Sequence, residues 1–332
     1  MDRPLVEVTR GDVVERIHRG GVVVVDADGT VLHALGDPQA ITTMRSAAKP
    51  IQVLPLLLAG GMERFGFTDR DLAMMCSSHY GEPFHIEILE SMLGKTGLRE
   101  ADLRCGAIPS INLSHALRQA RLGVRLNQLH SDCSGKHLGM LALCLLRGYP
   151  LADYVLPDHP VQRDILETFA GFCGMAPGDV RIGVDGCSAP VFALPLQRMA
   201  MAYARLVRSD SAPQPLGRAL SRVVAAMTGH PKLIAGSGGF CSELMGRTGG
   251  RLVGKIGADG VYCVGLAARG LGLAVKIADG NMAVLSTVVL QALDDLGALT
   301  GEEKRGLRGF WYRDVLNDRG QVVGVQRPSF RL

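Results

Sequence analysis

A serine and a lysine three residues apart are the first candidates for chemistry in this chain. Ser46 and Lys49 lie in segment 44–50, MRSAAKP, the one place where a lysine follows a serine at the third position. One turn of helix there would put the hydroxyl and the amine on the same face. A serine hydroxyl is a weak nucleophile until a base lies within hydrogen-bond reach, and a lysine with a lowered pKa is such a base. The spacing therefore predicts a serine nucleophile with a lysine partner.

A second lysine candidate lies far downstream. Enzymes of the β-lactamase type combine Ser-x-x-Lys with a Lys-Thr-Gly element on a late strand. Lys255 begins the similar sequence KIG in a predicted C-terminal hairpin. The literal KTG at 95–97 closes a predicted helix instead, where Lys and Gly are ordinary residues. We interpret Lys255 as a functional candidate, although a solvated strand lysine would give the same pattern.

A further hydroxyl follows the apolar segment 72–75. The sequence CSSHYGE at 76–82 places two serines and a histidine directly after that segment, and such loop edges often carry active sites. Ser78 is therefore a candidate for a second hydroxyl positioned by a lysine, with a turn or helix N-cap serine as the alternative. His79 lacks the companion elements of a zinc deaminase, so we do not expect a metal there.

Two of the eight cysteines have polar neighbours. Cys133 lies in HSDCSGKH at 130–137, which opens a predicted helix, and helix N-termini favour thiolates. Cys187 lies in DGCSAP at 185–190, directly after an apolar segment. Two such thiols, if close in the fold, could bind zinc. Buried structural cysteines are the commoner outcome, and this is how we interpret the other six.

Composition limits the kinds of partner. The chain has 332 residues, 47% of them hydrophobic, which suits a globular enzyme with a large core. The net charge of +4 includes no basic run, and aromatic residues are only 5%, so we expect no nucleic-acid partner. No segment reaches the ~18 apolar residues of a membrane helix, and the N-terminus lacks an apolar leader. We expect a cytoplasmic protein with no membrane contact, acting on a small molecule.

Strand patterns gather at the two ends of the chain. Apolar segments 22–25 and 30–33 flank an Asp-Gly turn, and segments 252–256, 261–264, 273–277 and 322–325 follow near the other end. Helical patterns cover 44–60, 84–95, 114–120, 136–147, 160–173, 215–227 and 282–296. We therefore predict an α/β protein of the α+β type, whose antiparallel sheet comes from both chain ends and is packed with helices. It would form one domain, 1–332, with β-rich ends of about 1–40 and 235–332 and a mainly helical middle of about 41–234.

Taken together, these segments resemble a known family. The sequences RSAAKP at 45–50, CSSH at 76–79, HSDCSGKH at 130–137, DGC at 185–187 and KIGA at 255–258 are similar to those of the Rhizobium etli-type (class 3) L-asparaginases, often labelled asparaginase II. The resemblance extends from about Val6 to the C-terminal strands. It implies a fold similar to serine β-lactamases, penicillin-binding proteins and glutaminases, a homodimer, and hydrolysis of L-asparagine to L-aspartate and ammonia.

The resemblance also implies roles for particular residues. Two Ser-Lys tandems are expected, with Ser46 as the nucleophile beside Lys49, and Ser78 with Lys255. A zinc site would fall on Cys133, Lys136 and Cys187. Lysine is an unusual zinc ligand because its amine must be deprotonated to coordinate.

The expected chemistry is consistent with these roles. Two lysines near one hydroxyl lower each other's pKa, so one of them can act as a neutral base. An amino-acid substrate also needs an anion for its ammonium and a cation or N–H groups for its carboxylate. Asp185, Arg45 and His137 are the nearest candidates for these contacts.

One departure from the β-lactamase pattern argues against antibiotic binding. Segment 131–133 reads Ser-Asp-Cys, so a thiol stands where β-lactamases carry the amide of Ser-Asp-Asn. Two alternatives remain: a related serine hydrolase acting on L-glutamine or another small amide, and a zinc-holding binding protein without turnover. Substrate assays and replacement of Ser46 distinguish them.

Overall fold

The chain forms two compact units. The computed structural model describes residues 2–332. The first unit, here called the sheet unit, contains the chain up to Ala47 together with Leu194–Val207 and Glu243–Leu332. The second, here called the helical unit, contains Ala48–Ala193 and Arg208–Ser242. Each unit therefore joins segments that are distant in the sequence.

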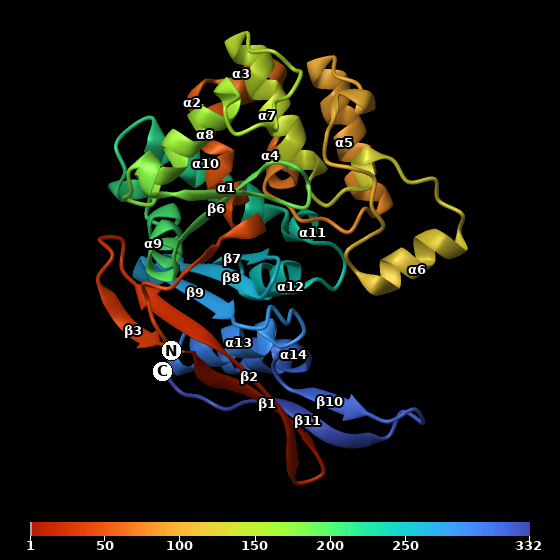
Figure 1. The fold of residues 1–332 in the computed structure, drawn as a ribbon, viewed down its shortest axis with the longest axis vertical. Coiled ribbons are helices and arrows are strands. Elements are labelled where there is room, and N and C mark those ends of the chain that lie inside the picture. Colours follow the sequence, from red (N-terminus) through yellow and green to blue (C-terminus); the bar gives the residue numbers. More distant parts are fainter. Residues whose placement is uncertain (1) are drawn as a thin grey trace. The chain divides into compact units, whose positions relative to one another are not determined.

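An antiparallel sheet built from both chain ends dominates the sheet unit (Figure 1). Its strands are β1 (Arg3–Arg10), β2 (Val13–Val25), β3 (Val31–Leu35), β7 (Leu252–Gly257), β8 (Val261–Leu266), β9 (Leu271–Ile277), β10 (Arg313–Leu316) and β11 (Val322–Pro328). The order is β10-β11-β1-β2-β9-β8-β7, with β3 paired to β2 beside this path. The short strand β4 (Ile41–Thr43) follows β3. The predicted antiparallel sheet is confirmed.

The centre of this sheet is covered on both faces. Val22 to Val25 of β2 are all fully buried, a continuous apolar run that fits a strand with helices on either side. α9 (Leu196–Leu206) packs on β9, β8 and β2, and α13 (Leu285–Asp295) packs on β9, β8, β1 and β11. Gly272 of β9 permits the close approach of α9, because a Cβ there would lie 1.8 Å from the Ala200 carbonyl oxygen.

The hairpin of β7 and β8 positions Lys255 within the sheet unit. Lys255 pairs with Cys263 across the hairpin and is fully buried. The turn contains Asp259 and Gly260, both with left-handed backbone at φ 56° and 73°. Asp and Gly tolerate this conformation better than other residues, so the Asp-Gly pair explains why the chain reverses here.

Short helices fill the helical unit. They are α1 (Lys49–Gln52), α2 (Leu54–Leu58), α3 (Gly61–Phe65), α4 (Asp69–Met75), α5 (Pro83–Thr96), α6 (Leu113–Arg121), α7 (Ser134–Arg147), α8 (Pro160–Phe172), α10 (Leu216–Gly229) and α11 (Pro231–Ile234). α4 lies at their centre and contacts α5, α7, α10 and α11 (Figure 1). A hairpin of β5 (Arg181–Val184) and β6 (Pro190–Pro195) follows α8 in the chain. The remaining helices are α12 (Phe240–Arg247) and α14 (Gly301–Trp311).

The start of α7 lies against the end of α4 because of one glycine. A Cβ at Gly135 would lie 2.1 Å from the Met74 carbonyl oxygen, so no larger residue fits there without a backbone shift. This approach brings the segment before α7 to the segment after α4. Both segments carry residues that the sequence analysis selected.

The structure refines several predicted elements. The predicted helix 44–60 divides into the 3₁₀ helix η1 (Arg45–Ala48), α1 and α2, with Pro50 and Pro55 near the starts of the two α-helices, where proline is tolerated. α9 lies in the predicted helical middle yet belongs to the sheet unit. Within residues 2–332, none of the helices is long and apolar enough to cross a membrane.

Candidate active site

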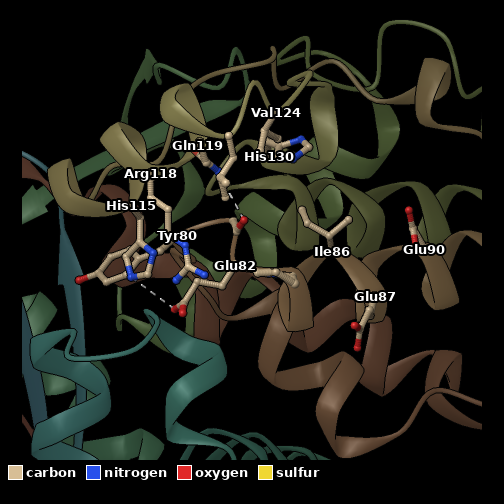
Figure 2. Close-up of a pocket in the computed structure, with 13 residues that line it drawn as sticks. Tyr80, Glu82, Ile86, Glu87, Glu90, His115, Arg118, Gln119, Val124 and His130 are labelled. Carbon is tan, nitrogen blue, oxygen red and sulfur yellow. Dashed lines mark hydrogen bonds and ion pairs between the residues drawn. The ribbon is translucent and has the colours of Figure 1, made fainter.

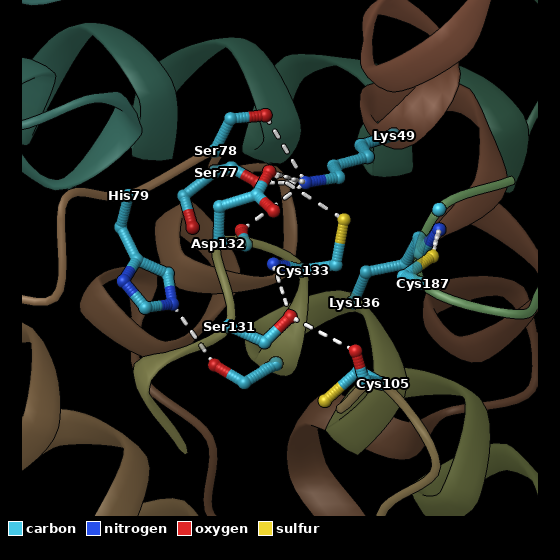
Figure 3. Close-up of polar contacts among 12 residues, drawn as sticks. Lys49, Ser77, Ser78, His79, Cys105, Ser131, Asp132, Cys133, Lys136 and Cys187 are labelled. Atoms are coloured by element: carbon cyan, nitrogen blue, oxygen red, sulfur yellow. Dashed lines mark hydrogen bonds and ion pairs between the residues drawn. The ribbon is translucent and has the colours of Figure 1, made fainter. Parts of the chain in front are cut away.

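Lys49 is the centre of a buried polar cluster in the helical unit. Its side chain is 1% exposed. The Lys49 Nζ donates hydrogen bonds to the Ser77 carbonyl, to Ser78 Oγ at 3.1 Å and to the Asp132 carbonyl at 3.2 Å (Figure 3). The Asp132 carboxylate lies 3.6 Å from the same nitrogen. Lys49 and Ser78 are therefore within hydrogen-bond reach of each other.

The surroundings keep Lys49 in its ammonium form. Burial alone lowers the pKa of the Lys49 side chain, but the negative charge shared by Cys133 and Cys187, together with that of Asp132, outweighs burial, and the pKa lies above its ordinary value. Three hydrogen-bond acceptors around one nitrogen fit an ammonium group with three protons. Lys49 must therefore lose a proton before it can act as a base.

Backbone hydrogen bonds fix the position of Ser78. The Ser78 N–H donates to the Ile234 carbonyl at 2.8 Å, and the Tyr80 N–H donates to the Ala235 carbonyl at 2.8 Å. The neighbouring Ser77 hydroxyl donates to the Met74 carbonyl at the end of α4. Ser78 is only 3% exposed. These bonds hold the segment after α4 in place, with the Ser78 hydroxyl within hydrogen-bond reach of Lys49.

Two thiols and a second lysine lie beside this cluster (Figure 3). Cys133 is the N-cap of α7, Lys136 lies in the first turn of α7, and Cys187 lies between β5 and β6. All three are buried. The Lys136 Nζ donates a hydrogen bond to Cys187 Sγ at 3.0 Å. The structure therefore brings together the three residues that the resemblance implies as zinc ligands.

The two thiols differ in their affinity for a proton. Hydrogen bonding from Cys133, together with the positive charge of Lys136, holds the pKa of Cys187 far below its ordinary value. The same hydrogen bond and burial raise the pKa of Cys133. For Lys136, burial lowers the pKa, but the negative charge that Cys133 and Cys187 share through their hydrogen bond outweighs burial and raises the pKa. The centre therefore contains a Cys187 thiolate, a Cys133 thiol and a Lys136 ammonium.

His137 follows Lys136 and is fully buried. Its Nδ1 lies 2.6 Å from the Tyr154 hydroxyl, which accepts a hydrogen bond from the Arg104 N–H at 3.0 Å. The hydroxyl therefore donates its own proton to Nδ1. The buried Nε2 therefore carries the ring proton, on the side of His137 that interacts with Cys187. Burial lowers the pKa of His137, so the ring is neutral.

The donor set fits a zinc ion. Thiolate sulfur and neutral nitrogen are the ligands that zinc prefers, and Cys133, Lys136 and Cys187 supply two sulfurs and one amine. Within residues 2–332, no group of three or more His, Cys, Asp and Glu side chains is arranged to hold a metal. The site fits only when Lys136 is counted among the donors.

Ser46, Arg45 and Lys255 belong to the sheet unit. Ser46 lies in η1 and is partly exposed. Arg45 directly before it has left-handed backbone, with φ 49°, and its guanidinium forms an ion pair with Asp259. The fully buried Lys255 donates a hydrogen bond to the Ile256 carbonyl.

The predicted Ser-Lys tandems each divide between the two units. Ser46 belongs to the sheet unit and Lys49 to the helical unit, and Lys255 and Ser78 divide in the opposite way. The Ser-Lys contact within the helical unit joins Lys49 to Ser78, the hydroxyl that the resemblance assigns to Lys255. Sequence spacing favoured Lys49 as a partner of Ser46, since the two are three residues apart. It could not reveal the contact of Lys49 with Ser78, because only tertiary packing brings residues 49 and 78 together.

His79 and Asp185 each form hydrogen bonds with nearby groups of the helical unit. The Gly81 N–H donates to His79 Nδ1, so His79 Nε2 carries the proton and donates to Ser134 Oγ at 2.9 Å. Burial holds the pKa of His79 well below its ordinary value. Asp185, predicted to bind a substrate ammonium, accepts a hydrogen bond from the Gly186 N–H at 2.8 Å.

Sequence reasoning missed Asp132 and Tyr154. Asp132 stands in the selected segment 130–137, and its position next to Cys133 could have indicated a role beside the metal ligands. Tyr154 lies outside every selected segment, and no sequence signal connects it with His137. Its role depends on a contact across 17 residues of chain.

A separate cavity of about 310 Å³ lies beside the segment that follows Ser78. Figure 2 shows its lining, which comes from α5, α6 and the residues before α7. Glu82 and His115 lie 3.8 Å apart there, and Arg118 lines the same cavity. None of the catalytic, substrate-binding or metal residues predicted from the sequence lines it.

The chain was compared with protein families, curated proteins and solved structures. The family model described as L-asparaginase II matches residues 6–328. A search of curated protein sequences found no match. The solved structure of Mglu in its native form, in 4.3 M NaCl, is similar with a TM-score of 0.45 and 16% identity, covering 84% of this chain and 61% of that chain.

A second solved structure, a provisionally assigned β-lactamase from Bacteroides dorei DSM 17855, is similar with a TM-score of 0.43 and 12% identity. It covers 82% of this chain and 92% of its own. The present chain thus spans 61% of the length of Mglu and most of the length of the second protein.

Proposed function

The chain belongs to the L-asparaginase II family, and from this we propose that it is an amidohydrolase that converts L-asparagine to L-aspartate and ammonia. Family membership supports amide hydrolysis as the general reaction. The choice of L-asparagine as substrate is the finer part of the proposal.

The buried contact between Lys49 and Ser78 is the observation that carries this proposal. A lysine that is 1% exposed and donates to a serine hydroxyl at 3.1 Å is expensive to bury and unusual in a purely structural role. Ser-Lys pairs activate hydroxyls in hydrolases. The contact therefore supports hydrolysis over simple binding.

The proposed reaction has two halves. The Ser46 oxygen attacks the carbon of the substrate side-chain amide while its proton moves to a neutral lysine amine. The tetrahedral intermediate then expels ammonia, as the C–N bond breaks and a lysine ammonium returns a proton to the leaving nitrogen. Water hydrolyses the resulting aspartyl ester of Ser46, releasing aspartate and restoring the hydroxyl.

The two lysines are suited to different roles. Lys49 is a hydrogen-bonded ammonium, so we assign it the acid role in the reaction, with the Ser78 hydroxyl as its hydrogen-bond partner. We assign Lys255 the base role toward Ser46, since both residues belong to the sheet unit. The packing of Gly257 against the backbone of Met44 supports this pairing, because a Cβ at Gly257 would lie 2.7 Å from the Met44 carbonyl oxygen.

We propose that Cys133, Lys136 and Cys187 hold zinc. When bound, zinc would supply a positive charge and a Lewis acid beside Asp132 and Lys49. Asp185, Arg45 and His137 remain the proposed contacts for the substrate ammonium and carboxylate. We further propose a homodimer, which light scattering coupled to gel filtration would test as a doubled mass.

The deciding experiment measures ammonia release from L-asparagine and L-glutamine by wild type and Ser46→Ala. We expect asparagine-selective release that falls at least ~10³-fold in the variant, since removing a serine nucleophile has effects of this size. Ser329→Ala, which changes an exposed serine near the C-terminus, is the control and should behave as wild type. Glutamine-selective release would make L-glutamine the substrate in place of L-asparagine. No ammonia release from either amide by folded wild type would favour the binding-protein alternative.

Mass spectrometry of the trapped acyl-enzyme identifies the nucleophile. We expect the adduct on the peptide that contains Ser46. An adduct on Ser78 instead would make the Lys49–Ser78 pair the attacking pair and would remove Ser46 from that role.

A further inference from the structure

The residue before the proposed nucleophile has a strained backbone. Arg45 has φ 49°, a conformation that a long side chain rarely adopts because its Cβ crowds the carbonyl oxygen. Among residues 2–332 only three other non-glycine residues share a positive φ, and two of them are aspartates, which tolerate it better. Such strain persists only where the surrounding structure maintains it.

An ion pair joins Arg45 to the neighbouring hairpin. The Arg45 guanidinium bonds to the carboxylate of Asp259, in the turn between β7 and β8. The Arg45 side chain is 22% exposed and that of Asp259 is 67% exposed, so the pair lies at the surface of the sheet unit. An isolated pair this exposed contributes little to stability. Its conspicuous effect is to attach the residue before Ser46 to the turn.

The turn itself is held from the other side. The Lys276 Nζ of β9 donates hydrogen bonds of 2.6 Å to the carbonyls of Asp259 and Ile277. Gly257, two residues before Asp259, packs so closely on segment 44–45 that an added Cβ would lie 3.3 Å from the Arg45 Cβ. The same hairpin carries the buried Lys255 two residues earlier.

We propose that Asp259 is a positioning residue: it anchors Arg45 in its left-handed conformation and thereby sets the direction of the Ser46 hydroxyl relative to the hairpin that carries Lys255. This inference rests on the proposed function, because it takes Ser46 as the nucleophile. It gives Arg45 a conformational role in addition to the proposed contact with the substrate carboxylate.

The inference predicts a particular kinetic pattern. Asp259→Asn keeps a side chain that tolerates positive φ but removes the charge, so it isolates the ion pair. We expect kcat to fall about tenfold while KM changes less than about twofold, since a misdirected nucleophile affects the reaction and not binding. A fall in KM with unchanged kcat would mean that Asp259 only competes with the substrate carboxylate for Arg45, and it would overturn the positioning role.

Two substitutions of Arg45 separate the effect of its backbone conformation from the effect of its guanidinium. Glycine adopts positive φ without strain, whereas alanine does not. We expect Arg45→Gly to retain at least about fivefold more kcat than Arg45→Ala, although both lack the guanidinium. Both variants lose any contact with the substrate carboxylate, so that loss cancels in the comparison. Equal kcat in the two variants would overturn the proposal.

Covalent labelling of Ser46 makes the test independent of the substrate. A fluorophosphonate probe reacts with activated serines, and the rate of modification of the Ser46 peptide is measured by mass spectrometry for wild type and all three variants. We expect the rate of modification to be highest in wild type, lower in Arg45→Gly and lowest in Arg45→Ala. Asp259→Asn should also react more slowly than wild type. Labelling of Ser46 without ammonia release from asparagine would reject the proposed substrate while still testing the positioning role.

Asp279→Asn is the matched control. Asp279 is another half-exposed aspartate of the sheet unit, and it bonds to His18 at 2.7 Å. We expect wild-type labelling and kcat for this variant. A wild-type labelling rate in Asp259→Asn, a decrease in Asp279→Asn as large as in Asp259→Asn, or failure of wild-type Ser46 to react at all would overturn the inference.

Discussion

The two units bury different kinds of residue. The interior of the sheet unit consists largely of apolar strand residues such as Val22 to Val25, with Lys255 as a fully buried lysine. The helical unit buries Lys49, Lys136 and three histidines of low pKa, His79, His85 and His137. Burying such groups requires partners for each of them.

This difference indicates that the two units contribute different properties to the protein. The sheet unit supplies a closely packed frame in which individual backbone positions are fixed, as at Gly272 and Arg45. The helical unit supplies charge, because its short helices end in loops whose carbonyls and thiols surround Lys49 and Lys136. We therefore expect the sheet unit to be sensitive to side-chain volume and the helical unit to be sensitive to charge and pH.

Replacement of Lys49 should have the largest effect. Lys49→Met leaves the Asp132 carboxylate and two carbonyls without their buried partner, and breaking a buried pair in this way costs about 3–5 kcal/mol. Ammonia release should also be lost. Urea unfolding monitored by circular dichroism measures the change, and Lys232→Met, at an exposed lysine of the same unit, should be neutral. An unchanged unfolding free energy for Lys49→Met would mean that the charge cluster is not what holds the helical unit together.

Acid should weaken the helical unit through its buried histidines. Burial lowers the pKa of His85 to about 4, below the ordinary 6.5, so the unfolded chain binds more protons between these values. Stability due to His85 is therefore present above pH 6.5 and is lost as the pH falls toward 4, by about 3 kcal/mol in total. When the unfolding free energy is measured from pH 7 to 4, its decrease with falling pH should be smaller in His85→Gln than in wild type. His33→Gln, at an exposed histidine of β3, should leave the slope unchanged.

The sheet unit should respond to volume instead. A Cβ at Gly272 would lie 1.8 Å from the Ala200 carbonyl, so Gly272→Ala should separate α9 from β9 and destabilise the protein by about 1–3 kcal/mol. The effect should not depend on pH. Gly309→Ala in α14 meets no atom within 4 Å and should stabilise the protein by about 0.5–1 kcal/mol. Thermal unfolding of both variants tests this contrast, which fails if Gly272→Ala is neutral.

The smallest effect concerns a helix end. Thr68 and Asp71 form a capping box at the start of α4, the helix that leads to Ser77 and Ser78. Thr68→Ala should cost about 1 kcal/mol, because the Asp71 N–H loses its side-chain acceptor. Thr30→Ala in the sheet unit should cost less, because the backbone N–H and carbonyl of residue 30 that bond to Asp26 remain after the substitution. A larger loss for Thr30→Ala would reverse the comparison.

Local sequence signals predicted much of the fold. The Asp-Gly turn at 259–260 and its flanking apolar residues predicted the β7–β8 hairpin, because turn chemistry and strand pattern act over a few residues. Gly97, in left-handed conformation after α5, confirms that KTG at 95–97 ends a helix. β1 and β10 were not predicted, because β10 has only four residues, two of them charged, and β1 has charged residues at both ends and in its middle. Their pairing with β11 depends on contacts from the opposite end of the chain.

The sequence by itself determined which residue types stand in which segments, and so the family, the antiparallel sheet from both chain ends and the set of candidates from Ser46 to Lys255. Tertiary structure alone decided which candidates meet. Lys49 reaches Ser78 and Asp132, Lys136 reaches Cys187, and Arg45 reaches Asp259, over separations of 29, 83, 51 and 214 residues. Spacing along a chain specifies neighbours within a helical turn, whereas contacts over such separations depend on how all the intervening elements pack.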